Sequence, residues 1–359
     1  MSATPAPQAQ LHFTRALDAR LASFLEQQAE VVRQISPDAV PLVERIATLT
    51  AGGKRLRPLF AFWGSLAAGG RSDDPALPTL GAALELFQAA ALIHDDLIDH
   101  SDTRRGGPSV HRRFEALHRE SAWDLDAQDF GTSAAILAGD LALSMSEQLF
   151  AQALPTPRAR DLFDVMRTQV MAGQYLDVLE EQIGGSRTPA EAVAAARTVV
   201  RFKSAKYSVE NPVLLGAAQA GADEALLARL SEFALPLGEA FQLRDDELGV
   251  FGDPATTGKP AGDDLREGKR TLLIALTRER AQDQDSWDLL SHLGRPDLSE
   301  PVVEAIRTMM RQVGALAAHE EIIESLTQQA LSALDAAGLP EQAREGLRTA
   351  GLRAVRRSA

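Results

Sequence analysis

The chain of 359 residues contains no cysteine. This absence excludes a framework of disulfide bonds and also excludes metal sites built on thiolates. The chemistry left to the side chains is that of carboxylates, imidazoles, hydroxyls and amines. Any metal ion that the protein binds should therefore be a hard cation that prefers oxygen ligands.

Excess positive charge and long apolar runs are also lacking. The formal net charge is −13, which argues against binding to nucleic acid. The longest nearly apolar run, residues 81–93, contains Glu85 and Gln88 and is too short to span a bilayer. Residues 1–11 have neither the basic start nor the apolar segment of an export signal, and we expect them to form a disordered tail. These features predict a cytoplasmic protein without stable membrane insertion.

Helical periodicity is present along most of the chain. Apolar residues recur at spacings of three and four, which is the pattern of helices that bury one face. No run with the period of a strand competes, and the breaks that contain glycine and proline are too short to be domain linkers. The sequence therefore predicts a single all-α domain over residues 12–359. The expected helices cover residues 13–32, 56–67, 78–98, 132–153, 158–182, 189–207, 209–220, 223–248, 265–281, 299–317, 320–336 and 340–353.

A cluster of aspartates ends the helix expected at 78–98, in the stretch ALIHDDLIDHSDTRRGGPSVH. Asp95 and Asp99 are four residues apart and share one helical face, and Asp96 lies roughly 100° around the axis. Carboxylates at this spacing repel one another, and the C-terminal end of a helix disfavours anions. A bound cation would offset both costs, whereas a solvated acidic face without a ligand is the alternative.

A second pair, Asp245 and Asp246, follows apolar residues in the stretch FQLRDDELGVFGDPATTGKP, and Asp253, Asp263 and Asp264 come soon after it. Several oxygen ligands without histidine or cysteine at metal spacing suit Mg²⁺, which binds through a few carboxylates together with substrate phosphates. The two clusters therefore predict a magnesium site whose ligand is a diphosphate.

Basic residues accompany both acidic clusters, as a diphosphate ligand would require. The block GGKRLRP places Lys54 and Arg57 after two glycines at a helix start, where backbone N–H groups favour an anion. Any one of these side chains could equally serve only to keep the surface soluble. The remaining candidates are Arg104, Arg105, Lys203, Lys206, Lys259 and Lys269.

At this point the sequence resembles the trans-type isoprenyl diphosphate synthases, also called polyprenyl synthetases. The resemblance rests on seven blocks in the order of the family, and together they span nearly the whole chain. It implies an all-α bundle with a deep central cavity that works as a homodimer. The blocks are GGKRLRP, LIHDDLIDHSDTRRGGPSVH, AAILAGDLAL, MAGQYLDV, RFKSAKYS, FQLRDDELGVFGDPATTGKP and DDLREGKRTLLIAL.

The resemblance also implies roles for individual residues. Asp95, Asp96 and Asp99 match the first aspartate motif, and Asp245 and Asp246 match the start of the second. Together these motifs would hold three Mg²⁺ ions, with Mn²⁺ as a possible substitute. Arg104, Lys203 and Lys259 would contact the allylic diphosphate. Isopentenyl diphosphate would be held by Lys54, Arg57, Gln88 and Arg105, and the other residues expected at the substrates are Ser204, Gln242 and Lys269.

The implied reaction is the condensation of isopentenyl diphosphate with dimethylallyl, geranyl or farnesyl diphosphate. Loss of the allylic diphosphate would leave a carbocation, which the isopentenyl double bond attacks. A proton would then pass to the released pyrophosphate, so no protein base is required. One departure from the family is Gly249, which replaces the third aspartate of the second motif.

The length of the product can be argued from the size of side chains before Asp95. Farnesyl-type members carry aromatic residues where this chain has Ala90 and Ala91, so the pocket should be deeper than a fifteen-carbon product needs. Phe87, two turns before Asp95, would be the next obstacle. We therefore expect geranylgeranyl diphosphate, with farnesyl diphosphate or a longer chain as alternatives.

Two other classes of protein share parts of this pattern. A terpene cyclase would not need Lys54, Arg57 and Arg105, and it would have more aromatic residues than the 5% found here. A non-catalytic regulatory subunit of a heteromeric synthase would keep the fold and lose aspartates. The intact first motif argues against this second alternative, whereas Gly249 keeps it open.

Overall fold

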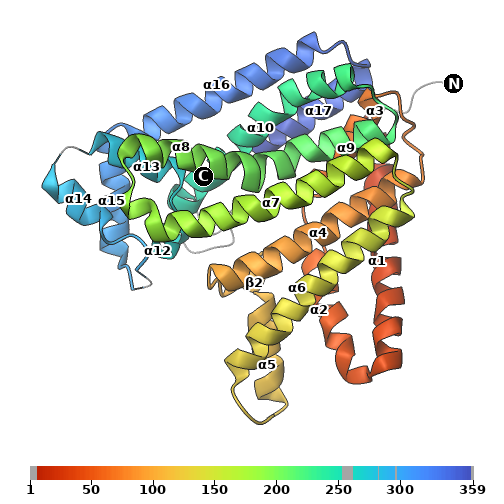
Figure 1. The fold of residues 1–359 in the computed structure, drawn as a ribbon, viewed down its shortest axis with the longest axis horizontal. Coiled ribbons are helices and arrows are strands. Elements are labelled where there is room, and N and C mark those ends of the chain that lie inside the picture. Colours follow the sequence, from red (N-terminus) through yellow and green to blue (C-terminus); the bar gives the residue numbers. More distant parts are fainter. Residues whose placement is uncertain (1–5, 253–261, 282, 296, 357–359) are drawn as a thin grey trace.

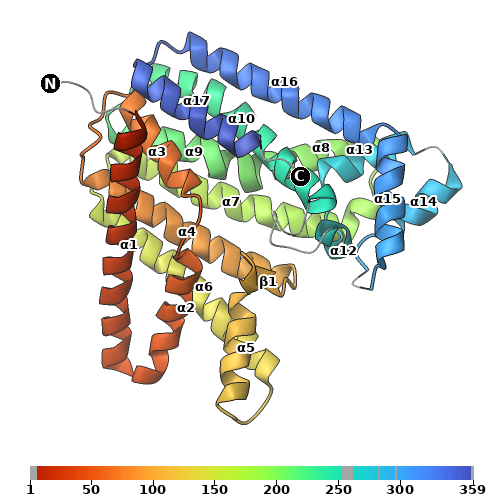
Figure 2. The same cartoon turned by 180° about the vertical axis from the view of Figure 1, so that it is seen from behind.

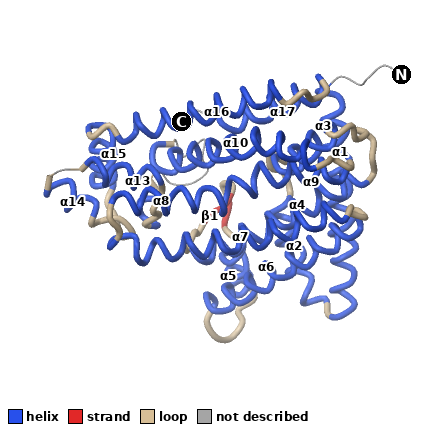
Figure 3. The backbone as a smooth tube through the Cα atoms, turned by 45° about the horizontal axis from the view of Figure 1, so that its top comes forward, coloured by secondary structure: helices blue, strands red, loops and turns tan. Residues whose placement is uncertain are grey.

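The computed structural model describes residues 6–252, 262–281, 283–295 and 297–356. These residues form a bundle of helices, with strands only in one short hairpin (Figure 1, Figure 3). The elements before the middle of the chain are α1 (Ala6–Ile35), η1 (Pro37–Ala39), α2 (Val40–Thr50), α3 (Leu56–Ala67), α4 (Ala76–Ile98), β1 (Thr103–Arg104), β2 (Gly107–Pro108), α5 (Val110–Glu120), α6 (Ala127–Gln152), α7 (Pro157–Ile183) and η2 (Gly184–Ser186). They are followed by α8 (Pro189–Val199), η3 (Val200–Glu210), α9 (Asn211–Gln219), α10 (Glu224–Phe251), α12 (Asp263–Glu267), α13 (Leu272–Arg280), α14 (Gln284–Leu290), α15 (Glu300–Gln312), α16 (Ala315–Ala336) and α17 (Glu341–Val355). The prediction of an all-α fold is confirmed.

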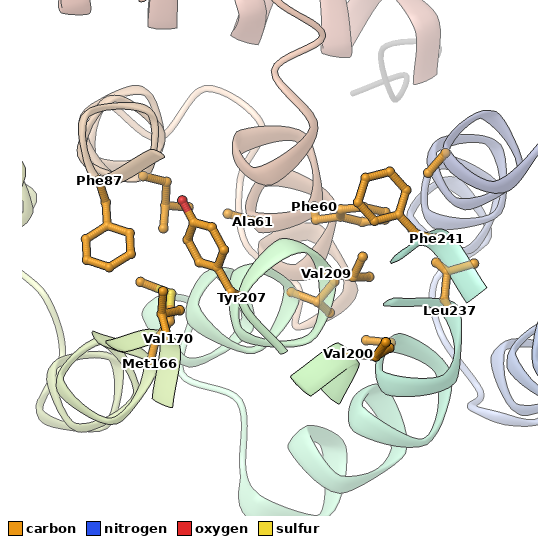
Figure 4. Packing of buried hydrophobic residues seen from close by; sticks show 14 of the residues in the cluster. Phe60, Ala61, Phe87, Met166, Val170, Val200, Tyr207, Val209, Leu237 and Phe241 are labelled. Atoms are coloured by element: carbon orange, nitrogen blue, oxygen red, sulfur yellow. The ribbon is translucent and has the colours of Figure 1, made fainter. Parts of the chain in front are cut away.

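Helix α4 lies at the centre of the bundle. It packs on α6, α1 and α3, whereas α7 packs on η3 and α9. By length and composition α4 could cross a membrane, but 72% of its most apolar window is buried inside the protein. It is therefore a core helix. One apolar cluster runs from Ala9 in α1 to Val355 in α17, and Figure 4 shows part of it between α4, α7, η3 and α10.

The N-terminal segment is more ordered than the sequence predicted. Helix α1 begins at Ala6, and Ala9 and Phe13 are buried in the core. These two residues are four apart, so Ala9 extends the apolar stripe of the helix by one turn. The expectation of a disordered tail over residues 1–11 is therefore wrong from Ala6 onward. The boundary of the single domain at residue 12 stays a prediction.

Several other elements differ from the expected helices. Helices α2 and α5 were not predicted, and α6 begins at Ala127 because Asp126 accepts hydrogen bonds from the backbone N–H groups of Gln128 and Asp129. The helix expected at 265–281 is two helices, α12 and α13, separated by a turn at Gly268 with φ of 80°. In Figure 2, α5 projects from the bundle on the same side as the hairpin of α1 and α2.

The segment η3 is a π-helix that continues α8, where the sequence predicted ordinary helix through residue 207. Its backbone is approached closely from two sides by glycines. A Cβ atom at Gly173 of α7 would lie 2.4 Å from the backbone nitrogen of Lys203, and one at Gly238 of α10 would lie 2.5 Å from the oxygen of Ala205. Both neighbouring helices therefore fix the position of η3, on which Lys203 stands.

Candidate active site

The first aspartate cluster forms the last turn of α4 and its C-cap. Nζ of Lys203 and Nε2 of Gln174 lie 3.3 and 3.1 Å from Oδ1 of Asp95. Asp96 is buried, and its Oδ1 accepts a hydrogen bond of 2.8 Å from Nε of Arg104. Asp99 is also deeply buried, with Oδ2 3.0 Å from Nζ of Lys269. The helix end thus directs three carboxylates toward cations from other parts of the chain.

These contacts separate the acidities of two aspartates on one face. Burial by itself would raise the pKa of Asp95, but the charges of Lys203, Lys269 and Arg104 outweigh it and lower the pKa to about 2. Burial raises the pKa of Asp99, and the charge of Asp95 adds to this effect although Lys269 opposes it. The surrounding cations therefore favour the ionised form of Asp95 more strongly than that of Asp99.

Arg104 and Arg105 are positioned by the hairpin of β1 and β2. Thr103 pairs with Pro108 and Arg104 pairs with Gly107, so Arg105 and Gly106 form the turn. Both turn residues have positive φ, 54° and 75°, as a tight hairpin turn with the native strand twist requires. Arg104 reaches back to Asp96, and Nη1 of Arg105 donates a hydrogen bond of 2.8 Å to the carbonyl oxygen of Leu49.

The block GGKRLRP lies beside this hairpin. A Cβ atom at Gly53 would be 3.2 Å from Nη1 of Arg105, which shows how closely the loop and the hairpin approach. Arg55 precedes α3 with φ of 50° and forms ion pairs with Asp18 and with the buried Glu85. This anchor fixes the loop on which Lys54 is exposed to solvent.

Tyr207 of η3 connects two of the predicted substrate residues. The guanidinium carbon of Arg57 lies 4.1 Å from the centre of the Tyr207 ring, and Nη2 of Arg57 donates a hydrogen bond of 2.7 Å to Oγ of Ser208. The hydroxyl of Tyr207 donates a bond of 2.6 Å to Oε1 of Gln88 on α4. Burial raises the pKa of this hydroxyl, so it remains a hydrogen-bond donor at neutral pH.

The second acidic cluster, Asp245 and Asp246, is on α10. Nε2 of Gln242 donates a bond of 2.6 Å to Oδ1 of Asp246, which is buried, while Asp245 beside it is half-buried. Burial raises the pKa of Asp246 well above its ordinary value, and the charge of Asp264 adds to this effect. Nζ of Lys269 lies 3.0 Å from Asp99 and 3.7 Å from Asp264. Lys269 therefore connects the end of α4 with the segment after α10.

Three polar residues of α7 belong to this group, although the sequence had assigned them no role. Gln174 contacts Asp95, Asp177 accepts a hydrogen bond from Nζ of Lys203, and Glu181 lies one turn further along the same face. Burial, together with the charges of Asp177 and Asp99, raises the pKa of Glu181 to about 7. Gln174 and Asp177 stand in the block MAGQYLDV, and the available signal was the spacing of three between them and of four from Asp177 to Glu181.

The carboxylate oxygens of the site are suitable ligands for a divalent cation, but their arrangement in the described part of the chain does not form a coordination shell. Among the residues that the structure describes, no three acidic or histidine side chains already converge on a point where a metal could be held. The carboxylates are instead paired with Arg104, Lys203 and Lys269. Yet burial raises the pKa values of Asp99 and Asp246, so a cation bound nearby would stabilise the ionised form of both.

The residues predicted to limit the product lie on one side of α4. Asp95, Ala91 and Phe87 are spaced by four and so share one face. Ala90 is fully buried, and Ala91 is half-buried. The buried ring of Phe87 lies 5.3 Å from the ring of Tyr207 and 6.4 Å from that of Phe163, with Met166 and Val170 of α7 close by (Figure 4).

The structure therefore brings most of the predicted site residues together around α4, η3 and α10. Ser204 is half-buried next to Lys203 on η3. Lys206 instead pairs with Glu210, four residues further along η3. Lys259 lies outside the residues that the structure describes, so its expected closure over the substrate stays a prediction.

Comparison with known proteins identifies the family. The family model for polyprenyl synthetases matches residues 41–310. A geranylgeranyl diphosphate synthase of Sulfolobus acidocaldarius is 34% identical over 274 residues, covering 74% of this chain and 76% of the relative. A geranylfarnesyl diphosphate synthase of Aeropyrum pernix is 32% identical over 275 residues, covering 75% and 78%.

A solved structure is similar over nearly the whole chain. It is the geranylgeranyl pyrophosphate synthase of Corynebacterium glutamicum complexed with isoprenyl diphosphate and magnesium, with a TM-score of 0.90 and 40% identity. The match covers 96% of this chain and 99% of that one. The chain described here therefore belongs to the polyprenyl synthetase family and is a prenyltransferase.

Proposed function

We propose that the protein condenses isopentenyl diphosphate with an allylic diphosphate in a reaction that requires Mg²⁺, and that its main product is geranylgeranyl diphosphate. The observation that carries this proposal is the pairing of two largely buried lysines with the carboxylates at the end of α4 and beside it. Lys203 contacts Asp95 and Asp177, while Lys269 contacts Asp99 and lies 3.7 Å from Asp264, which follows the second cluster in the chain. Such an arrangement can exchange its internal ion pairs for those with a diphosphate and its metal ions.

Asp95, Asp96 and Asp99 would hold Mg²⁺ from the side of α4, and Asp245 and Asp246 would hold it from α10. Bound magnesium would neutralise the diphosphate and so make it a better leaving group. The magnesium in the Corynebacterium glutamicum relative supports this assignment. We retain the expectation of three ions, with Mn²⁺ as a possible substitute.

The basic residues of the site would bind and orient the allylic diphosphate. Arg104 and Lys203 each contact an aspartate of the first motif and are largely buried, so their charges act in surroundings from which water is excluded. Lys269 would add a third charge from the opposite side, and Lys259 would close over the substrate. Gln242, held by Asp246, and Ser204 would line the pocket of the reacting carbons.

Isopentenyl diphosphate would lie between the loop GGKRLRP and the hairpin. Lys54 and Arg105 come from two segments that touch at Gly53, and Arg57 is held by its stacking on Tyr207. Gln88 completes this group through the hydroxyl of Tyr207. Since the released pyrophosphate can accept the proton, the residues here need only bind and orient the substrate and exclude water.

The twenty-carbon product is supported by the shared face of Asp95, Ala91 and Phe87. Small side chains at Ala90 and Ala91 leave space for the growing chain, and the buried Phe87 would stop it. Similarity alone does not decide the length, because comparably similar relatives are named for products of different length. Farnesyl diphosphate or a longer product remains the alternative.

A homodimer is the expected assembly. Helices α6 and α7 each leave large apolar side chains exposed, which a second copy of the chain could cover. We also retain the expectation of a cytoplasmic location. The exposed apolar residues are Ile136 and Leu137 on α6, and Val165, Met171 and Tyr175 on α7.

The deciding experiment is incubation of the purified protein with Mg²⁺, isopentenyl diphosphate and, separately, each of dimethylallyl, geranyl and farnesyl diphosphate. Products are sized after dephosphorylation. A twenty-carbon alcohol is expected, while a fifteen-carbon alcohol would refute only the argument from Phe87 and the two alanines. The Asp95→Ala, Asp96→Ala double variant should be inactive. If the protein works only in a complex with a catalytic subunit, unchanged activity of the reconstituted complex with this variant would instead favour a non-catalytic regulatory subunit.

A further inference from the structure

At Gly249, where the chain departs from the family motif, the structure places another carboxylate, that of Asp264. Gly249 lies in α10, one turn after Asp245, at the position of the missing third aspartate. A Cβ atom at Gly249 would lie 1.9 Å from Oδ2 of Asp264 and 2.4 Å from its Cγ. No side chain fits there while Asp264 keeps its place. The carboxylate of Asp264 thus occupies the space in which a side chain of residue 249 would begin.

Asp264 faces both acidic clusters from this position. Its side chain is 14% exposed, and its Oδ1 lies 3.7 Å from Nζ of Lys269. The same Nζ lies 3.0 Å from Oδ2 of Asp99. This oxygen is buried and accepts no hydrogen bond from the residues that the structure describes. Asp264 also approaches α10 at Gly249, one turn after Asp245. Asp264 therefore lies between the first cluster, which it approaches through Lys269, and the helix α10 that carries the second cluster.

The location of Asp264 is set by its short helix. Gly262 and Gly268 flank α12 in the left-handed region, with φ of 75° and 80°. A Cβ atom at Gly268 would lie 2.7 Å from Cα of Gly294, and the backbone N–H of Gly294 donates a bond of 3.0 Å to the oxygen of Leu265. These backbone contacts fix α12 against the segment at Gly294, and α12 also packs on α10, so the approach of Asp264 to Gly249 follows from the fold.

We infer that Asp264 replaces the missing third aspartate and binds a divalent cation together with Asp245 and Asp246. Glycine at position 249 is then a requirement of the site, since it makes room for a carboxylate supplied by another helix. The role of this cation in catalysis rests on the proposed function, whereas the binding of the cation itself does not depend on turnover.

The inference predicts that restoring the family residue is harmful. Gly249→Asp would bring a second carboxylate into the space of Asp264, where the two would clash and repel. We expect the dissociation constant for Mn²⁺, measured with the full chain and inorganic pyrophosphate by the electron paramagnetic resonance of free Mn²⁺, to rise on the order of 10- to 100-fold. Asp264→Asn, which keeps the shape and removes the charge, should cause a rise of the same order.

The sharpest test moves the carboxylate from position 264 to position 249. In the double variant Gly249→Asp, Asp264→Ala, the carboxylate moves from α12 to α10, and Mn²⁺ binding should recover to within about 3-fold of the unaltered protein. Asp263→Asn is the matched control, because it removes the same charge from the neighbouring residue of α12, and it should leave the dissociation constant unchanged. Circular dichroism establishes that each variant is folded.

Each outcome decides the inference. Unchanged or tighter Mn²⁺ binding in Gly249→Asp or in Asp264→Asn would overturn it, as would equal losses in Asp264→Asn and Asp263→Asn. If Gly249→Asp does not fold, the Asp264→Asn and Asp263→Asn pair still gives the answer. Failure of the proposed function would look different, since the unaltered protein would then bind Mn²⁺ but form no prenyl product.

Discussion

Phe87→Ala should lengthen the product by one five-carbon unit. At a rise of about 1.5 Å per residue, Ala91 and Phe87 lie about 6 and 12 Å along α4 from Asp95. One extended isoprene unit adds four backbone bonds, or about 5 Å at bond lengths near 1.5 Å. Each helical turn removed from the obstruction therefore corresponds to about one condensation. Truncation of Phe87 should shift the main product from twenty to twenty-five carbons.

The extension should stop there because a second aromatic layer lies behind Phe87. The rings of Phe163 and Phe150 stack with centres 3.9 Å apart, and Phe163 lies 6.4 Å from Phe87. Two arginines pack on these rings. The guanidinium carbon of Arg160 lies 4.6 Å from the centre of the Phe150 ring, and that of Arg167 lies 5.0 Å from the centre of the Phe163 ring. Both arginines donate hydrogen bonds to Glu147, which holds them in place.

The assay is the sizing of dephosphorylated products with farnesyl diphosphate as the primer. Because a buried Phe→Ala change costs about 3 to 5 kcal/mol of stability, Phe87→Leu is a milder companion, and thermal unfolding is followed for both. Phe150→Ala serves as the control, since the second layer should not matter while Phe87 is in place. A folded and active Phe87→Ala enzyme that still makes only the twenty-carbon product would refute the reasoning.

Three further predictions concern the polar residues around the site. Asp177→Asn should lower kcat on the order of 10- to 100-fold with a smaller change in KM, because Lys203 loses one of its carboxylate partners and its fixed position; steady-state kinetics would contradict this if only KM changed. Arg57→Lys keeps the charge but loses the stacking on Tyr207, so KM for isopentenyl diphosphate should rise more than KM for the allylic substrate. Burial raises the pKa of Glu181 to about 7 from 4.5, so its protonated form stabilises the fold at low pH and this contribution is lost as the pH rises from 4.5 through 7. Glu181→Gln should therefore be the more stable protein above pH 7 without metal, and parallel curves of Tm against pH for the two proteins would contradict this.

The sequence by itself determined the secondary structure class and the local geometry of the first motif. Long helices such as α4, α7 and α10 were visible because a helix places residues three and four apart on one face regardless of what it packs against. For the same reason the common face of Asp95 and Asp99 could be derived without the fold. The shorter helices α2 and α5 were missed, since 11 residues give only about three repeats of the period. The start of α1 was placed too late, because its first two turns add only a few apolar residues.

Only the tertiary structure decided which charges meet. Lys203 and Asp177 are 26 residues apart in the chain, and the contact between them depends on the close approach of Gly173 to η3. The sequence likewise showed Gly249 as a loss, while the fold places the carboxylate of Asp264 in the space that this glycine leaves. Periodicity is a property of neighbouring residues, whereas these contacts depend on how whole helices pack, and that packing minimises the free energy of the entire core rather than of any one segment.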